Sequence, residues 1–117
     1  MALAKTKDLV ATNPVVVFSK SYCPYCARVK KLLAELGATF KAVELDIERL
    51  ADAGYSLSDG GEIQAALAEW TKQRTVPNVF IGGKHIGGCD DTVALNSQGK
   101  LVLLLKEAGA IAASASS

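Results

Sequence analysis

The sequence of 117 residues has few cysteines, no long apolar run and no excess of either charge. Its 3 cysteines are too few and too odd in number for a secreted disulfide scaffold, which indicates a reducing compartment. We expect the cytoplasm, although a trimmed form imported into an organelle would look the same. No apolar run approaches the roughly 18 residues that span a bilayer. With 13 basic and 12 acidic side chains, the net charge of +1 gives no sign of a nucleic-acid or membrane partner.

The length leaves room for one compact domain with its own hydrophobic core. We expect this domain to cover residues 1–111, and the alanines and serines of 112–117 to form a flexible tail. A short helix is predicted over residues 3–12, where an Asn-Pro pair ends it. The continuous apolar run of residues 15–18 predicts a strand that is buried on both faces.

The hydrophobic pattern changes its period after Pro24, which is suited to the first turn of a helix. Apolar residues recur at the i, i+3, i+4 and i+7 spacing of an amphipathic helix, at Val29, Leu32, Leu33 and Leu36. Gly37 is expected to end this helix. A strand is predicted over residues 40–45, so strand, helix and strand follow one another in the order of a parallel βαβ unit.

The second half of the chain predicts a helix, a hairpin and further helices. The helical spacing returns at Ile63, Ala66, Leu67 and Trp70. A glycine pair forms the turn between short strands at 79–81 and 84–86. One helix can open at 90–92, and residues 101–108 form the last one. This order predicts an α/β fold in which helices flank a mixed four-stranded sheet, and a thioredoxin-like architecture is the simplest topology that fits.

Two cysteines stand two residues apart in the motif Cys23-Pro24-Tyr25-Cys26, between the first strand and the first amphipathic helix. The N-terminus of a helix offers free backbone N–H groups and the positive end of a dipole, which favour a thiolate at Cys23. Cys26 lies one turn further along and is expected to be more buried. We therefore predict that Cys23 attacks a disulfide and that Cys26 resolves the mixed disulfide that forms.

A structural cysteine pair, or half of a zinc site, is the alternative interpretation of this motif. Zinc normally takes four ligands, and only Cys89 and His85 remain to complete such a set, so we expect no metal. Cys89 by itself is typical of a small buried apolar residue.

Two further motifs lie later in the chain. Thr75-Val76-Pro77 stands just before the hairpin, where an X-Pro bond is a natural place for a cis peptide that turns backbone groups toward a neighbouring site. Gly87-Gly88-Cys89-Asp90-Asp91 follows the hairpin, and its two carboxylates are suited to cap the helix that begins there.

These motifs together resemble the dithiol class of the glutaredoxin family. The segments that carry the resemblance are residues 20–26, 73–77 and 87–91, and the likeness covers about residues 8–110. It implies that the proline is cis and faces the active cysteine, and that glutathione binds beside it. The residues that this resemblance assigns to the glutathione site are Lys20, Tyr25, Gln64, Arg74, Thr75, Val76, Pro77, Gly88, Cys89, Asp90 and Asp91.

The resemblance also implies a division of labour within that site. Val76 pairs with the cysteinyl part of glutathione through its backbone N–H and C=O. Residues 88–91 receive the γ-glutamyl end, with helix amides for its α-carboxylate and an Asp carboxylate for its ammonium group. The ring of Tyr25 packs over the bound thiol. The glycine carboxylate is contacted by Lys20, Gln64 and Arg74.

The function implied by this resemblance is that of a glutathione-dependent thiol-disulfide oxidoreductase. Glutathione is the reducing co-substrate, the partners are glutathionylated or disulfide-containing proteins, and we expect the chain to act as a monomer. The sequence departs from the family in the connection over 47–58, which is longer than usual, and at Lys72, where glycine is common. Both departures would alter partners rather than chemistry.

Two rival functions stay open at this point. In an iron-sulfur carrier, two chains would hold one cluster between their Cys23 thiolates, and two glutathione molecules would supply the other ligands. Pro24 argues against this rival, because cluster-binding relatives usually have a smaller or more flexible residue there. A thioredoxin-like electron donor, recycled by a flavoprotein reductase, is disfavoured by Lys20 and by the turn at 88–91.

Overall fold

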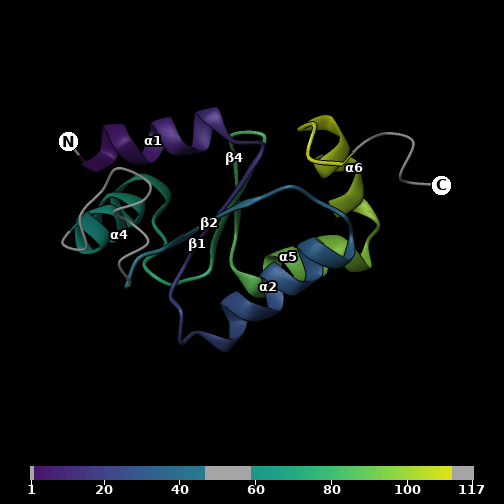
Figure 1. Ribbon diagram of the computed structural model, residues 1–117, viewed down its shortest axis with the longest axis horizontal. Coiled ribbons are helices and arrows are strands. Elements are labelled where there is room, and N and C mark those ends of the chain that lie inside the picture. The colour runs from purple at the N-terminus through teal and green to yellow at the C-terminus, as the bar shows by residue number, and fades with distance from the viewer. Residues whose placement is uncertain (1, 47–58, 112–117) are drawn as a thin grey trace.

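A mixed sheet forms the centre of the computed structural model, which describes residues 2–46 and 59–111 (Figure 1). Its strands are β1 (Val15–Ser19), β2 (Lys41–Glu44), β3 (Asn78–Ile81) and β4 (Lys84–Gly87). They lie in the order β2-β1-β3-β4, with β1 parallel to β2 and antiparallel to β3, and with β3 antiparallel to β4. The predicted parallel unit, hairpin and four-stranded sheet are confirmed, while the predicted loop 47–58 and tail 112–117 lie outside the described residues.

Helices cover both faces of this sheet (Figure 1). They are α1 (Ala2–Thr12), α2 (Pro24–Glu35), α4 (Asp59–Thr71), α5 (Cys89–Ser97) and α6 (Lys100–Glu107). Helices α1 and α4 pack together on one face, whereas α2, α5 and α6 gather on the other. Helix α4 begins about one turn before residue 63, where the apolar spacing first predicted a helix. Its first turn has no apolar residue of that spacing, so the sequence pattern does not reveal it.

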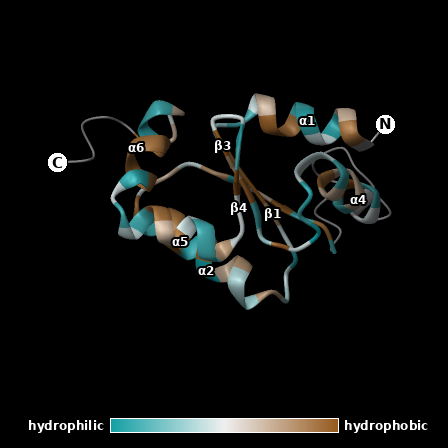
Figure 2. Ribbon diagram, turned by 180° about the vertical axis from the view of Figure 1, so that it is seen from behind, coloured by the Kyte–Doolittle hydropathy of each residue, from teal (hydrophilic) through white to brown (hydrophobic). Residues whose placement is uncertain are grey.

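Strand β1 explains why the core has two halves. All five of its residues are buried, which confirms the prediction made for the apolar run at 15–18 and extends it to Ser19. Successive side chains of a strand point to opposite faces, so Val15 and Val17 pack toward α2, α5 and α6, while Val16 and Phe18 pack toward α1 and α4. Figure 2 shows hydrophobic residues along β1 and β3, which lie between helices of mixed hydropathy.

Strand pairing also determines where the connections emerge. Phe18 near the end of β1 pairs with Asn78 at the start of β3, so the chain leaving β1 and the chain entering β3 lie side by side. The first of these connections leads into the N-terminus of α2, and the second carries Val76 and Pro77. Two segments distant in sequence therefore meet at one end of the sheet.

Among the helices of residues 2–46 and 59–111, none combines the length and the apolar character needed to cross a membrane.

Replacement of Phe80 by alanine is expected to lower the free energy of unfolding by about 3–5 kcal/mol. The Phe80 ring is 1% exposed, meets Phe18 edge to face at a centroid distance of 5.9 Å, and stacks on Trp70 at 5.0 Å. Urea unfolding monitored by circular dichroism measures the loss. Leu103→Ala is the matched control, since that side chain is 56% exposed and its removal should change the free energy by less than about 0.5 kcal/mol. Equal effects of the two substitutions would contradict the assignment of Phe80 to the core.

Candidate functional site

Cys23 is the N-cap residue of helix α2, and Pro24 occupies the first helical position. Its backbone is extended, at φ −85° and ψ 114°, so the side chain turns back over the first turn of the helix. There its sulfur accepts a hydrogen bond from the backbone N–H of Cys26 at 3.2 Å. Cys23 is partly exposed, and its sulfur lies beside the free backbone amides at the N-terminus of the helix.

The loop before β3 supplies the second contact to this sulfur. The Cys23 thiol faces the carbonyl oxygen of Val76, with 3.8 Å between sulfur and oxygen. The Val76–Pro77 peptide bond is cis, which confirms the expectation for this X-Pro bond. The Cys23 sulfur thus connects the start of α2 with the loop before β3, although the two segments are more than fifty positions apart in the sequence.

Cys26 has a different environment, although it is only one turn further along the helix. Its side chain is fully buried, as predicted. Burial raises the pKa of the Cys26 thiol to about 12, the hydrogen bond with Cys23 adds to this effect, and the Lys30 ammonium opposes it. At neutral pH Cys26 is therefore a thiol, and its thiolate population grows only as the pH rises toward that value.

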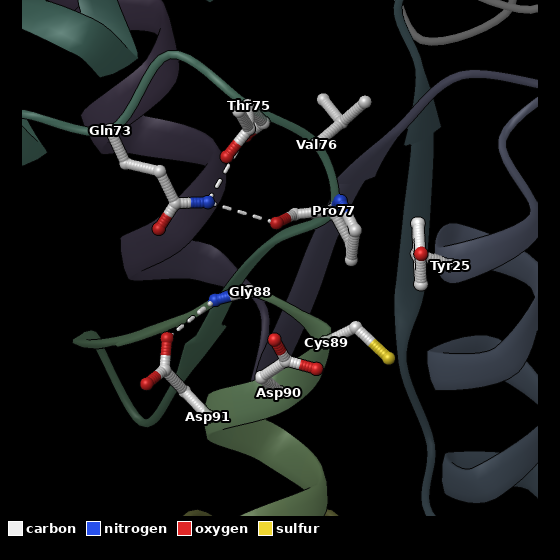
Figure 3. Close-up of a pocket in the computed structure, with 9 residues that line it drawn as sticks. All are labelled: Tyr25, Gln73, Thr75, Val76, Pro77, Gly88, Cys89, Asp90 and Asp91. Carbon is white, nitrogen blue, oxygen red and sulfur yellow. Dashed lines mark hydrogen bonds between the residues drawn. The ribbon is translucent and has the colours of Figure 1, made fainter.

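An open cavity of about 460 Å³ lies beside the cysteine pair. Its walls come from three segments: the first turn of α2, the loop before β3, and the beginning of α5 (Figure 3). The lining residues are Tyr25, Gln73, Thr75, Val76, Pro77, Gly88, Cys89, Asp90 and Asp91. All of these except Gln73 were assigned to the glutathione site on the basis of the sequence.

Gln73 holds the shape of the loop that forms one wall. Its side-chain amide donates hydrogen bonds to the carbonyl oxygens of Thr75 at 3.0 Å and Pro77 at 2.9 Å (Figure 3). Gln73 belongs to the motif at 73–77, but no role in the site was predicted for it. The available signal was its place just before a turn at proline, where carbonyl groups without a strand partner need a side-chain donor.

The N-terminus of α5 forms the opposite wall. Gly88 is the N-cap residue, and its backbone N–H donates to the Asp91 carboxylate at 3.1 Å. Gly87 has a positive φ of +124°, and a Cβ atom there would overlap the Asp91 carboxylate, so this turn requires glycine. The Asp90 carboxylate is exposed, faces the loop that carries Pro77 (Figure 3), and forms no hydrogen bond or ion pair with the residues described. The free amides of the first turn of α5 open toward the same cavity.

Three residues of the predicted site do not line this cavity. Gln64 and Arg74 line a second hollow of about 240 Å³, next to α4, where the Gln64 amide donates to the Arg74 carbonyl oxygen at 2.9 Å. Lys20 precedes the cysteine motif, and its carbonyl oxygen accepts the backbone N–H of Cys23 at 3.1 Å. Their role in binding stays a prediction.

The third thiol, Cys89, is 5% exposed and lines the cavity from the first position of α5. Burial raises the pKa of Cys89, and the Arg28 guanidinium opposes this effect. Within residues 2–46 and 59–111, no three histidine, cysteine, aspartate or glutamate side chains gather closely enough to bind a metal ion.

The three thiols are expected to react with iodoacetamide at very different rates. Cys23 is partly exposed, whereas Cys26 and Cys89 are buried and have raised pKa values, so near pH 8 they should react at least about a hundredfold more slowly. Peptide mass spectrometry of timed samples measures the three rates. The urea-unfolded chain is the control, because all three thiols should then react alike. Comparable rates at Cys23 and Cys26 in the folded protein would contradict the two environments.

Comparison with known proteins places this arrangement in a family. The glutaredoxin family model matches residues 15–86. Glutaredoxin-C6 of rice is 71% identical over 115 residues, which cover 98% of this chain and 95% of the relative. A crystal structure of wheat glutaredoxin has a TM-score of 0.84 and 71% identity, with 94% of each chain covered. A crystal structure of a buckwheat glutaredoxin-glutathione complex has a TM-score of 0.86 and 60% identity, covering 96% of this chain and 94% of that one.

These structures confirm the predicted thioredoxin-like fold, with its mixed sheet flanked by helices. The family predicted from the three motifs is confirmed as well, and the Cys23–Cys26 pair fits the active-site pattern of the plant dithiol members. The chain belongs to the glutaredoxin family.

Proposed function

We propose that this glutaredoxin reduces mixed disulfides between glutathione and proteins or small molecules, with glutathione as the reducing co-substrate. One observation carries the proposal: the sulfur of Cys23, a partly exposed residue, contacts Val76, which also lines a cavity of about 460 Å³. A nucleophile thus stands beside a hollow that can present a thiol compound to it. The buckwheat relative was crystallised as a complex with glutathione, which supports the choice of ligand.

The polarity of the cavity wall matches the parts of glutathione. Apart from its contact with the Cys23 thiol, the backbone of Val76 has no hydrogen bond to the described residues, so it can pair with the cysteinyl unit as a short antiparallel strand. The amides at the start of α5 suit the α-carboxylate of the γ-glutamyl unit, and the unpaired Asp90 carboxylate suits its ammonium group. Lys20 and Arg74 supply positive charge for the glycine carboxylate at the far end.

The reaction then proceeds in two exchanges. The Cys23 thiolate attacks the glutathionyl sulfur of the mixed disulfide, and the target leaves as a thiolate that takes up a proton. A second glutathione then attacks the glutathionyl sulfur bound to Cys23. Oxidised glutathione forms, and Cys23 leaves as a thiolate. Alternatively, the Cys26 sulfur attacks Cys23, a disulfide forms between them, and glutathione leaves as its thiol. Two further glutathione molecules reduce that internal disulfide.

All three segments that line the cavity come from one chain, so the proposed activity needs no second copy and we propose a monomer as the active form. Thiols that must stay reduced between turnovers suit a reducing compartment such as the cytoplasm.

Replacement of Cys23 by serine should reduce the rate of deglutathionylation by at least about a hundredfold, because serine cannot form the mixed disulfide. Cys26→Ser should keep at least about half of the rate, since glutathione can release Cys23 without the second thiol. The measurement is turnover of a glutathionylated peptide, coupled to glutathione reductase. Equal losses in both variants would contradict the single-thiol route.

Asp90→Asn should raise the apparent KM for a glutathionylated peptide about tenfold, because it removes the charge that pairs with the γ-glutamyl ammonium group. Asp8→Asn makes the same chemical change on the exposed outer surface of α1 and serves as the control. Initial rates over a range of peptide concentrations separate KM from kcat. An unchanged KM in Asp90→Asn would remove Asp90 from the proposed site.

A further inference from the structure

Glu44 is a carboxylate buried beneath the cysteine helix. It pairs in register with Ser19 across the parallel strands β1 and β2, and both residues are almost inaccessible, at 4% and 0% exposure. Ser19 follows Val15 and Val17 on the face of β1 that packs against α2. The side chain of Glu44 therefore lies on the same side of the sheet as the buried face of α2.

Both oxygens of this carboxylate have a partner. The Ser19 hydroxyl donates to Oε2 at 2.5 Å, and the Lys30 ammonium forms an ion pair with Oε1 at 2.6 Å. Lys30 is 26% exposed, so the pair is partly shielded from water and the ammonium is held at a defined place. A shielded ion pair contributes little net stability, because desolvation offsets the attraction between the charges. Its presence under the active-site helix points to a role other than stability.

Cys26 and Lys30 are one turn apart on α2, at positions i and i+4, so they share the face of the helix that turns toward the sheet. The positive charge of Lys30 acts on Cys26 and partly offsets the rise in pKa that burial causes. Cys26 itself is fully buried, and neither the Glu44 carboxylate that holds Lys30 nor any other described carboxylate or imidazole is among the groups that shift its pKa.

We propose that Lys30, held by Glu44 and Ser19, is a positioning residue for the second half of the reaction, in which its ammonium stabilises Cys26 as a thiolate during attack on glutathionylated Cys23. This inference rests on the proposed function. In the step, the Cys26 S–H bond breaks, a sulfur-sulfur bond forms between Cys26 and Cys23, and the bond from Cys23 to the glutathione sulfur breaks. The proton from Cys26 ends on the departing glutathione thiolate, so neither electrons nor protons are left over.

Besides Lys30, two groups act on Cys26, and neither is a cationic side chain. Cys23 faces Cys26 directly and raises the pKa of Cys26, and the Lys20 backbone hydrogen-bonds with it and lowers that pKa. From α5, Asp90 acts on Cys89, as does Arg28 from α2. Lys30 is therefore the cationic side chain that acts on Cys26 among the described residues.

The test follows closure of the internal disulfide directly. Reduced protein is mixed with oxidised glutathione, samples are quenched with acid, and mass spectrometry separates the reduced, glutathionylated and internally disulfide-bonded forms. Lys30→Met removes the charge and keeps much of the apolar stem, whereas Lys30→Arg keeps the charge. Lys31→Met is the matched control, because Lys31 stands next to Lys30 on α2 but is 80% exposed.

Lys30→Met should slow the conversion of glutathionylated protein to the internal disulfide about tenfold, and its rate profile should move to higher pH. Lys30→Arg should restore most of the rate, and Lys31→Met should match the unmodified protein. Because Lys30→Met leaves Glu44 buried without a cation, the double variant Lys30→Met/Glu44→Gln removes both charges and should show the same slow closure in a stable fold.

Closure as fast in Lys30→Met and in the double variant as in Lys31→Met would overturn this role of Lys30. Slow closure without a displaced pH profile, or slow closure that Lys30→Arg does not restore, would also overturn it, because a merely structural role predicts those results. If the unmodified protein never becomes glutathionylated at Cys23, the proposed function fails instead.

Discussion

The antiparallel pairing of β1 with β3 determines where the chemistry of this chain takes place. Because Phe18 lies opposite Asn78, the cysteine motif that follows β1 emerges beside the loop that precedes β3. The contact between the Cys23 sulfur and the Val76 carbonyl is a consequence of that register. A slip of one residue would turn the side chains of β3 to the wrong face and would carry the loop away from the sulfur.

The parallel pairing of β1 with β2 organises the layer beneath the cysteines in the same way. It sets Ser19 opposite Glu44, and the alternation of side chains along β1 turns both residues toward α2. Strand β1 therefore has two roles. Its pairing with β3 brings the cysteine motif next to the loop that carries Val76, and its pairing with β2 places the Glu44 carboxylate under α2. The reactive end of the molecule depends on a segment whose five residues are all buried.

Local sequence signals were sufficient for the fold because its elements carry an apolar run, an apolar helix face, a capping residue or a turn residue. The run at 15–18 and the glycine pair between the hairpin strands are local signals that need no knowledge of tertiary contacts. Gln73 and the ion pair between Lys30 and Glu44 could not be predicted in this way. An exposed and a buried glutamate look alike in a strand pattern, and the partner of Glu44 lies on another element. Gln64 and Arg74 were assigned to the glutathione site only by resemblance to the family. A resemblance does not show how far a residue lies from a cavity, and these two residues line a separate hollow.

The two thiols of the motif differ because their surroundings differ. A sulfur at a helix N-cap meets backbone amides, whereas a sulfur one turn later meets the apolar core. Because Cys26 is buried and protonated, it does not compete with Cys23 for attack on the substrate disulfide. The same burial slows its own attack on glutathionylated Cys23. A cation fixed on the next turn resolves this conflict, because it acts on the buried sulfur without exposing it to water. The Lys30–Glu44 pair lies under the helix and does not line the open cavity, so its charge can act on Cys26 without opening a path for water to that sulfur.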